Sequence, residues 1–335
     1  MQLAFSAVKE DQLGAKWQDL FTRHWPAYEH WFLSSGIEAR PTYARASKML
    51  KRHMPELVPT YERCCDLAGG GDLAARFLAL YNPPAYLTGC SQVVWPGEEP
   101  ILIRNYDYAP ALCEGLILHS RWNGRSVLAM VDCLWGVLDG VNDAGLAVSL
   151  TFGGRQVVGE GFGVPLILRY ILEFCDTVAD AAEVLRRVPS HMAYNITVVD
   201  RSGTFVTAYL APDRAPSLKQ IPIAANHQGR IDWHMYARAT STVERERFLF
   251  FRLQEENMTI EKLTACFLRP PLYTTAYQNS FGTIYTAAYR PCSMDATYIW
   301  PNGTWRQSIA RFKEGVRTQV FTPGMGQLDT AALRL

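Results

Sequence analysis

The 335-residue sequence lacks the features that would assign it to several large classes of protein. Its formal net charge is only +1, which argues against a broad nucleic-acid-binding surface. It has no apolar run long enough to span a membrane, and its N-terminus has no apolar signal core. Repeats and low-complexity tracts are also absent. We therefore expect a soluble, cytoplasmic protein that binds neither nucleic acid nor membrane.

The cysteines also lack the spacing that is typical of metal ligands. The eight cysteines are scattered, without a Cys-x-x-Cys pair. We expect most of them to be reduced and to pack as small apolar side chains, and we expect no metal ion and no resident cofactor. What the sequence does contain is apolar residues, at 48% against 19% charged residues, which is enough for a large core.

The pattern of apolar residues changes at residue 86. The first 80 residues have helical spacing, interrupted by prolines and by three consecutive glycines at 69–71. From residue 86 onward we predict strands at 89–95, 100–106, 114–122, 126–132, 145–152, 194–200, 203–210, 220–226, 282–290 and 295–300, and helices at 164–175, 177–188, 241–255 and 259–268. Residues 136–143 are interpreted as a turn-rich link. Strands segregated from helices favour an α+β fold with two packed antiparallel sheets and helices outside.

Cys90 is the strongest candidate for a nucleophile. It begins an apolar strand and follows Thr88 and Gly89, a small and flexible pair that permits close approach of the backbone. A thiol there can attack the preceding carbonyl group, take the acyl group from nitrogen to sulfur, and release it to water. The new N-terminal α-amine, with an ordinary pKa of about 7.7–8.0, is then a suitable general base. The alternative is a buried structural cysteine.

Arg104 lies near the end of the next predicted strand, and Asp107 directly follows that strand. Two adjacent strands can bring both side chains beside Cys90. A guanidinium group stabilises a thiolate, and a carboxylate can orient an α-amine. The alternative is an ion pair at the end of a strand, where charges beside apolar residues need partners.

Further candidates lie at the ends of other predicted elements. Asn226 can donate its amide to an oxyanion, although Asn more commonly caps a turn. Thr151 precedes two glycines and can present its N–H group to the same oxyanion. Arg245 lies near the start of a predicted helix and can face either the site or solvent, with solvent as the default. His227 admits a Cys–His mechanism, but we favour a structural role for it.

Taken in this order, the motifs resemble the penicillin acyltransferase-like (acyl-CoA:6-aminopenicillanic acid acyltransferase) family of N-terminal-nucleophile hydrolases and, more distantly, the choloylglycine hydrolases. The motifs that carry the resemblance are Gly89-Cys90-Ser91, Arg104-Asn105-x-Asp107, Val141-Asn142-x-x-Gly145-Leu146, Ala225-Asn226-His227 and Ser241-x-x-x-Arg245. The resemblance implies an αββα sandwich that cleaves itself before Cys90. Residues 1–89 would then be a helical propeptide or α-chain, and residues 90–335 the catalytic domain.

The resemblance also implies roles for individual residues. Cys90 is the nucleophile and its freed amine the base, while Asn226 and a backbone group near Thr151 form the oxyanion hole. The complete set implicated in catalysis is Cys90, Arg104, Asp107, Thr151, Asn226 and Arg245.

The expected activity is that of an amidohydrolase or acyltransferase that cleaves or forms an amide bond of an acylated small molecule through a Cys90 thioester. An acyl-CoA is a conceivable co-substrate, and a homo-oligomer is compatible with the sequence. Two alternatives stay open: an uncleaved hydrolase that uses Cys90 and His227, and a non-catalytic scaffold that binds an acylated ligand.

Overall fold

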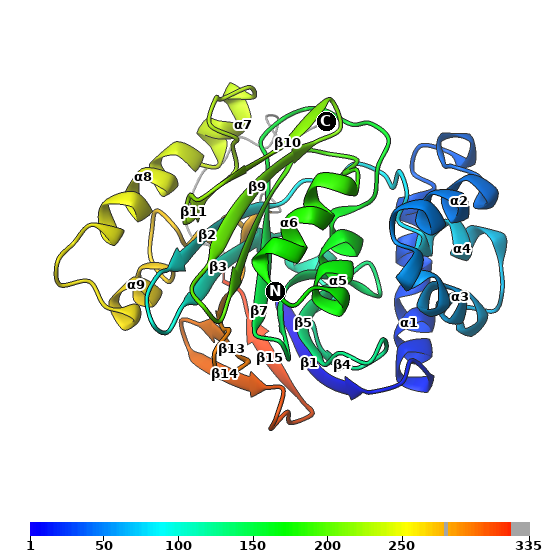
Figure 1. The fold of residues 1–335 in the computed structure, drawn as a ribbon, viewed down its shortest axis with the longest axis horizontal. Coiled ribbons are helices and arrows are strands. Elements are labelled where there is room, and N and C mark those ends of the chain that lie inside the picture. The colour runs from blue at the N-terminus through cyan, green and yellow to red at the C-terminus, as the bar shows by residue number, and fades with distance from the viewer. Residues whose placement is uncertain (278–280, 323–335) are drawn as a thin grey trace.

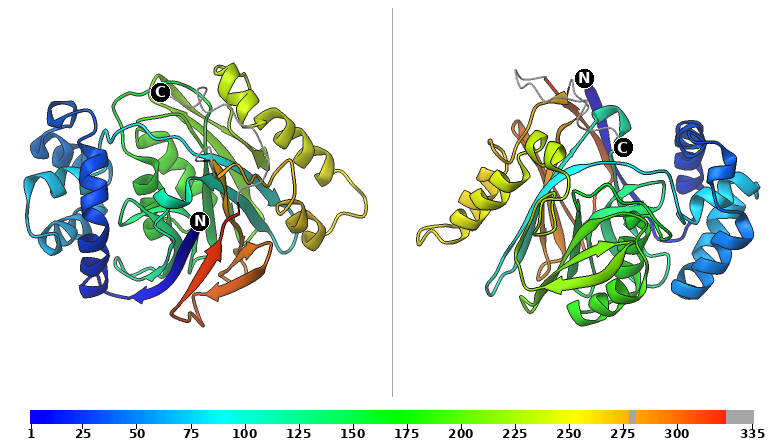
Figure 2. Two further views of the ribbon diagram at one scale, coloured as in Figure 1. Left: turned by 180° about the vertical axis from the view of Figure 1, so that it is seen from behind. Right: turned by 90° about the horizontal axis from the view of Figure 1, so that it is seen from above.

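The computed structural model describes residues 1–277 and 281–322. Within them, the strands form two sheets that pack face to face, and helices cover both outer faces (Figures 1 and 2). The four layers are clearest in the view from above in Figure 2. This arrangement confirms the α+β class and the αββα sandwich predicted from the sequence.

The larger sheet contains strands from both ends of the described chain. Its members are β1 (Gln2–Glu10), β4 (Leu116–Ser120), β5 (Val127–Asp132), β6 (Gly136–Asn142), β7 (Leu146–Phe152), β8 (Tyr194–Asp200), β9 (Phe205–Ala211), β10 (Arg214–Lys219) and β15 (Gly315–Val320). Their order across the sheet is β10-β9-β8-β7-β6-β5-β4-β1-β15. Every residue of β7 and β8 is buried. A strand covered on both faces is expected to be largely apolar along its whole length.

The smaller sheet carries the cysteine of interest. Its members are β2 (Gly89–Trp95), β3 (Ile101–Tyr108), β11 (Ile223–Ala224), β12 (Gly282–Arg290), β13 (Asp295–Trp300) and β14 (Gly303–Ser308). The order is β11-β2-β3-β12-β13-β14. β2 and β3 are antiparallel, with Cys90 opposite Tyr106 and Gly89 opposite Asp107. The inner faces of β2 and β3 contact β7.

The helices fall into three groups (Figure 1). Their bounds are α1 (Ala15–Phe32), α2 (Tyr43–His53), α3 (Val58–Leu67), α4 (Asp72–Leu78), α5 (Val164–Phe174), α6 (Val178–Arg187), α7 (His234–Ala239), α8 (Thr242–Leu253) and α9 (Ile260–Cys266). α5 and α6 cover the larger sheet, α8 covers β2 and β11, and α1–α4 form a separate group at one side. In the parts of the chain described here, no helix is both long and apolar enough to cross a membrane.

Two predictions about secondary structure were wrong. Residues 1–10 do not extend the helical segment but form β1, whose alternate residues Phe5 and Ala7 are buried. Residues 136–142 form β6 rather than a turn-rich link. The glycines there reflect close packing, because a Cβ atom on Gly140 would lie 2.7 Å from Ala129 Cβ and 2.8 Å from Leu172 Cδ1.

β1 would hold the N-terminal segment in place even if the chain were cut between Gly89 and Cys90. β1 pairs in parallel with β4 and antiparallel with β15, so it lies inside the larger sheet. Phe5 packs against Tyr285 and Trp300 of the other sheet, with ring centroids 6.3 and 4.9 Å away. The N-terminal segment is therefore held by both sheets.

We expect fragments 1–89 and 90–335 to stay associated after cleavage, because separating them would remove β1 from two neighbouring strands. Native size-exclusion chromatography should give one peak containing both fragments, and denaturing chromatography should separate them. Two separate native peaks would contradict this prediction.

Candidate active site

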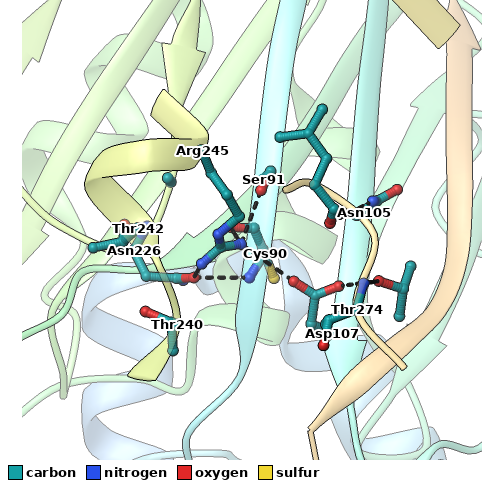
Figure 3. Close-up of polar contacts among 12 residues, drawn as sticks. Cys90, Ser91, Asn105, Asp107, Asn226, Thr240, Thr242, Arg245 and Thr274 are labelled. Atoms are coloured by element: carbon teal, nitrogen blue, oxygen red, sulfur yellow. Dashed lines mark hydrogen bonds and ion pairs between the residues drawn. The ribbon is translucent and has the colours of Figure 1, made fainter. Parts of the chain in front are cut away.

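Cys90 lies in a fully buried polar cluster at the start of β2 (Figure 3). Its Sγ atom is 3.0 Å from Nη2 of Arg104, and its backbone N–H donates to Oδ1 of Asn226 over 3.0 Å. Its carbonyl oxygen accepts a 2.8 Å hydrogen bond from Nη1 of Arg245. Three of the predicted site residues thus contact three different atoms of the cysteine.

The alternation of β2 and β3 divides the cluster between two faces of the smaller sheet. Cys90 and Arg104 point inward, toward the larger sheet, whereas Ser91 and Asp107 point outward, toward α8. One cation therefore approaches the cysteine side chain from within the sandwich. The second, Arg245, approaches its backbone from the helical layer.

Arg104 connects the thiol to the opposite sheet. Its Nη1 atom is 2.5 Å from Oδ2 of Asp139 on β6 and also donates to the carbonyl group of Leu138 over 2.9 Å. The hydroxyl groups of Tyr285 and Tyr289 donate to the Asp139 carboxylate. Burial opposes the charge on Arg104, but Cys90 and Asp139 outweigh it and raise the pKa of the guanidinium group above its ordinary value.

The thiol of Cys90 is not stabilised as a thiolate in the uncleaved chain. Burial raises its pKa, and the opposing effect of Arg104 is smaller. The sequence-based expectation considered the neighbouring cation but not the loss of water around the sulfur. The buried thiol therefore keeps its proton near neutral pH.

Arg245 is the centre of the outer half of the cluster. Its side chain, 3% exposed, donates to Ser91 Oγ (2.8 Å), Asp107 Oδ2 (3.2 Å) and Asn226 Oδ1 (2.7 Å), in addition to the carbonyl oxygen of Cys90. Residue reasoning alone left this side chain open between the site and solvent, with solvent as the default; the structure buries it. Position 245 lies on the face of α8 that packs on β2, where its charge needs buried acceptors.

Asp107 binds the same guanidinium group from β3. Its second oxygen, Oδ1, accepts a 2.7 Å hydrogen bond from Thr283 on β12. Burial raises the pKa of Asp107, while Arg245 and Thr283 lower it. The carboxylate lies opposite Gly89 in the strand pair, at the end of β2 where cleavage would create an amine.

Asn226 uses both ends of its amide. Oδ1 accepts from Cys90 and Arg245, whereas Nδ2 donates to the carbonyl oxygen of Phe152 over 3.1 Å. Its backbone N–H donates to Thr242 Oγ1 over 2.6 Å. The donor that we expected to face an oxyanion is thus bound to a carbonyl group in the uncleaved chain.

Thr151 supports Asn226 indirectly. Its hydroxyl group donates to the carbonyl oxygen of Ala225 over 2.7 Å, and it accepts from Asn195 Nδ2 over 3.0 Å. Asn195 also donates to the carbonyl groups of Ala225 and His227. Within the described residues, the Thr151 side chain has no hydrogen bond to Cys90, so the structure places it beneath the segment 225–227.

His227 is occupied away from the thiol. Its Nδ1 atom is 3.0 Å from Thr242 Oγ1, and its Nε2 atom is 3.0 Å from Glu246 Oε2. In the described chain, neither ring nitrogen has a hydrogen bond with Cys90. This geometry disfavours the Cys–His alternative.

The bond before Cys90 is held by aromatic residues. The hydroxyl group of Tyr236 donates to the carbonyl oxygen of Thr88 over 2.8 Å. A Cβ atom on Gly89 would lie 1.9 Å from Cζ of Phe281, so any larger residue would have to displace this ring. Of the aromatic residues near the motifs, Tyr108 lines a neighbouring cavity, whereas Tyr106, Trp135, Phe152 and Phe162 are buried in the core.

Sequence reasoning missed several members of the cluster. Asp139, Thr242, Thr283 and Ser91 were not selected, because their partners are distant in sequence or belong to the backbone. Asp139 had a usable signal, since it is a lone carboxylate among Val137, Leu138 and Val141. An acidic residue within an apolar segment needs a buried partner.

Removing Asp139 should leave the guanidinium group of Arg104 buried and uncompensated. We expect Asp139→Ala to lower the free energy of unfolding by about 3–5 kcal/mol. The matched control is Glu255→Ala, which breaks the exposed pair with Arg252 and should cost less than about 1 kcal/mol. Denaturant unfolding would measure both, and equal effects would show that the buried pair is not a structural link.

Comparison with known proteins gives one family and several structural likenesses. The family model of the acyl-coenzyme A:6-aminopenicillanic acid acyl-transferase matches residues 95–305. No curated protein matches the sequence. Penicillin V acylase from Agrobacterium tumefaciens is 14% identical, covers 68% of this chain and 90% of its own, and has a TM-score of 0.46.

Two further solved structures are similar at the same level. A mutant of the conjugated bile acid hydrolase from Clostridium perfringens is 11% identical and has a TM-score of 0.45, with 72% of this chain and 100% of that chain covered. The Caenorhabditis elegans ortholog of N-acylethanolamine-hydrolyzing acid amidase is 17% identical, with a TM-score of 0.45 and coverage of 61% and 93%.

Proposed function

We propose a function on the premise that the chain belongs to the acyl-coenzyme A:6-aminopenicillanic acid acyl-transferase family, whose model matches more than half of its length. The protein is an amide hydrolase or acyltransferase for acylated small molecules. It is activated by its own cleavage between Gly89 and Cys90. The observation that carries this proposal is the single buried cluster in which Asn226, Arg104 and Arg245 bind the nitrogen, sulfur and carbonyl oxygen of Cys90.

The activation step begins with attack of the Cys90 sulfur on the carbonyl carbon of Gly89. The C–N bond breaks, the nitrogen takes up the proton of the thiol, and Gly89 becomes a thioester of Cys90. Water then adds to the thioester, which releases a carboxylate on Gly89 and restores the thiol. The product residue carries both a nucleophile and an α-amine.

The same residues then serve the catalytic cycle. The α-amine of Cys90 accepts the thiol proton as the sulfur attacks the substrate amide, and the departing amine takes that proton. Water hydrolyses the resulting thioester, or an amine acceptor takes the acyl group. An acyl-CoA would be an alternative acyl donor: the Cys90 sulfur attacks its carbonyl carbon, the C–S bond to CoA breaks, and the CoA thiol leaves with the proton while the Cys90 thioester forms.

The surrounding charges suit an amine that acts as a base. Arg245 lies within hydrogen-bond distance of both the carbonyl group of Cys90 and Asn226 Oδ1, so a second positive charge on the cysteine nitrogen is disfavoured. A nearby cation lowers the pKa of an amine. Asp107 pairs with Arg245 and thereby limits how far this cation lowers the pKa of the amine. We assign the same carboxylate the role of orienting the amine.

Cleavage is the first test of this proposal. Intact mass and N-terminal sequencing should show a fragment that begins at Cys90, and Cys90→Ala should abolish both cleavage and amide hydrolysis. Cys90→Ser should cleave slowly, because a hydroxyl group is the weaker nucleophile at neutral pH. Cys292→Ala changes an exposed cysteine and is the matched control. A single uncut chain with full activity would contradict self-processing.

Asn226 and His227 separate the two possible mechanisms. In the proposed mechanism, Asn226 Nδ2 leaves the carbonyl oxygen of Phe152 to bind the oxyanion. Loss of one oxyanion donor costs about 10²–10³ in kcat, so Asn226→Ala should lower turnover by this factor. In the cleaved enzyme, His227→Ala should keep kcat within about tenfold, which corresponds to about 1.4 kcal/mol. Steady-state kinetics on a chromogenic amide would measure both. Loss of kcat in His227→Ala comparable to that in Cys90→Ala would instead support a Cys–His mechanism.

A further inference from the structure

A cavity of about 710 Å³ adjoins the bond that we propose is cut. Tyr236 and Phe281, which contact Thr88 and Gly89, are part of its lining. Residues 85–87, just before the bond, form another part of the wall. The chain on the acyl side of Gly89 therefore runs along the cavity. An acyl group bound to the same sulfur as a thioester would extend in the same direction.

One wall of the cavity holds two carboxylates that share a tyrosine. The hydroxyl group of Tyr28, on α1, is within hydrogen-bond distance of Glu114 Oε1 and of Asp132 Oδ1. Glu114 Oε1 also accepts from the backbone N–H of Leu134 over 2.8 Å. These contacts use only Oε1 of Glu114 and Oδ1 of Asp132. Within the described residues the second oxygen of each acid accepts no hydrogen bond, so it is available to a ligand.

No cation of the described chain neutralises this pair. Among residues 1–277 and 281–322, neither Glu114 nor Asp132 forms an ion pair with lysine, arginine or histidine. His24 also lines the cavity, but burial lowers its pKa and keeps it uncharged near neutral pH. Burial raises the pKa of Asp132 to about 7, and the neighbouring Glu114 contributes to the increase. Both side chains are only partly exposed, and carboxylates withdrawn from water are ordinarily paired, so this pair is the unusual feature of the cavity.

The other walls are aromatic. Trp31, Tyr86, Tyr108 and Phe281 line the cavity together with Tyr28. The hydroxyl group of Tyr86 is buried and has no hydrogen-bond partner in the described residues. Aromatic faces attract cations, and an ammonium group bound there would also supply donors to the carboxylates.

We infer that this cavity binds the acyl group of the substrate and that the acyl group carries an ammonium group, held by Glu114 and Asp132. The inference rests on the proposed function, and it specifies the substrate class of that site. It adds a requirement for positive charge at a distance from the reacting carbonyl. The aromatic walls would accept the carbon chain or ring that joins the ammonium group to the reacting carbonyl group.

Binding of simple probes tests the charge requirement without any catalysis. Isothermal titration would compare 4-phenylbutylammonium with the neutral, similarly shaped 4-phenylbutanol on the purified wild-type protein. We expect the ammonium to bind at least about tenfold more tightly, which corresponds to about 1.4 kcal/mol. Equal affinities, or no binding of the ammonium, would overturn the inference.

Substitutions then assign the preference to the acid pair. The double variant Glu114→Gln, Asp132→Asn keeps the hydrogen-bonding shape and removes the charge. It should bind the two probes equally. The control Glu183→Gln neutralises an exposed acid on α6 and should retain the wild-type ratio. If the folded double variant retains that ratio, the acids are not the cation site. The wild-type comparison decides the charge requirement even if the double variant does not fold.

Kinetics separate this inference from the proposed function. The 4-nitroanilides of 6-aminohexanoic and heptanoic acid differ only in the terminal ammonium or methyl group. We expect kcat/KM to favour the ammonium substrate by about tenfold or more in the wild type, and to lose this preference in the double variant. Equal, Cys90-dependent hydrolysis of both would leave the proposed function standing and overturn the cation inference. Binding of the ammonium through the acid pair without hydrolysis of either substrate would support the cation site and reject the proposed hydrolase.

Discussion

The ion pair between Arg104 and Asp139 is the interaction on which the candidate site depends. It lies between the two sheets, with both side chains fully buried, and it connects β3 to β6. Burying two charges is costly unless their remaining hydrogen-bonding atoms are satisfied. Two tyrosine hydroxyl groups donate to Asp139, and the carbonyl group of Leu138 accepts from Arg104. Within the described residues, only Nε of Arg104 is left without a hydrogen-bond partner in this pair. The sandwich thereby keeps a cation within 3.0 Å of a cysteine sulfur that is otherwise surrounded by core.

The second cation, Arg245, acts on the backbone of the same residue. Before cleavage, the Cys90 nitrogen is an amide that donates to Asn226, and burial keeps the thiol protonated. In the proposed mechanism, cleavage turns that nitrogen into an amine that can accept the thiol proton. The low-dielectric setting that disfavours a free thiolate also strengthens every charge–dipole contact around the reacting atoms. A base created on the nucleophile itself offsets the burial of the thiol.

The sequence revealed the part of the site that lies on one hairpin. Cys90, Arg104 and Asp107 lie on neighbouring strands joined by a short connection, so strand pairing brings them together directly. The sandwich also followed from the order of elements. Arg245 was ambiguous, because a residue near a helix start faces either solvent or sheet, and only packing decides between them. Asp139 was missed because its partner lies on the other sheet, which no local pattern reports.

The two errors in the predicted secondary structure also arose from contacts between elements that are distant in sequence. β1 and β15 pair across almost the whole chain, and such pairing leaves no trace in a short window of sequence. Gly136 and Gly140 were interpreted as turn residues, although they mark places where α5 and the neighbouring strand approach the β6 backbone. Local propensity identifies an element, whereas close approach between elements depends on the fold.

The N-terminal segment, residues 1–89, contributes both to the core and to the wall of the cavity. Its strand β1 lies inside the larger sheet, and its helix α1 contributes Tyr28 and Trp31 to the cavity. If the chain is cut before Cys90, the released end lies beside the cavity while the rest of the segment remains part of both the core and the cavity wall. Cleavage of one bond can then expose the nucleophile to the acyl-binding space without removing the residues that shape it. On the proposed cleavage, the segment would be a retained part of the enzyme rather than a protective cover.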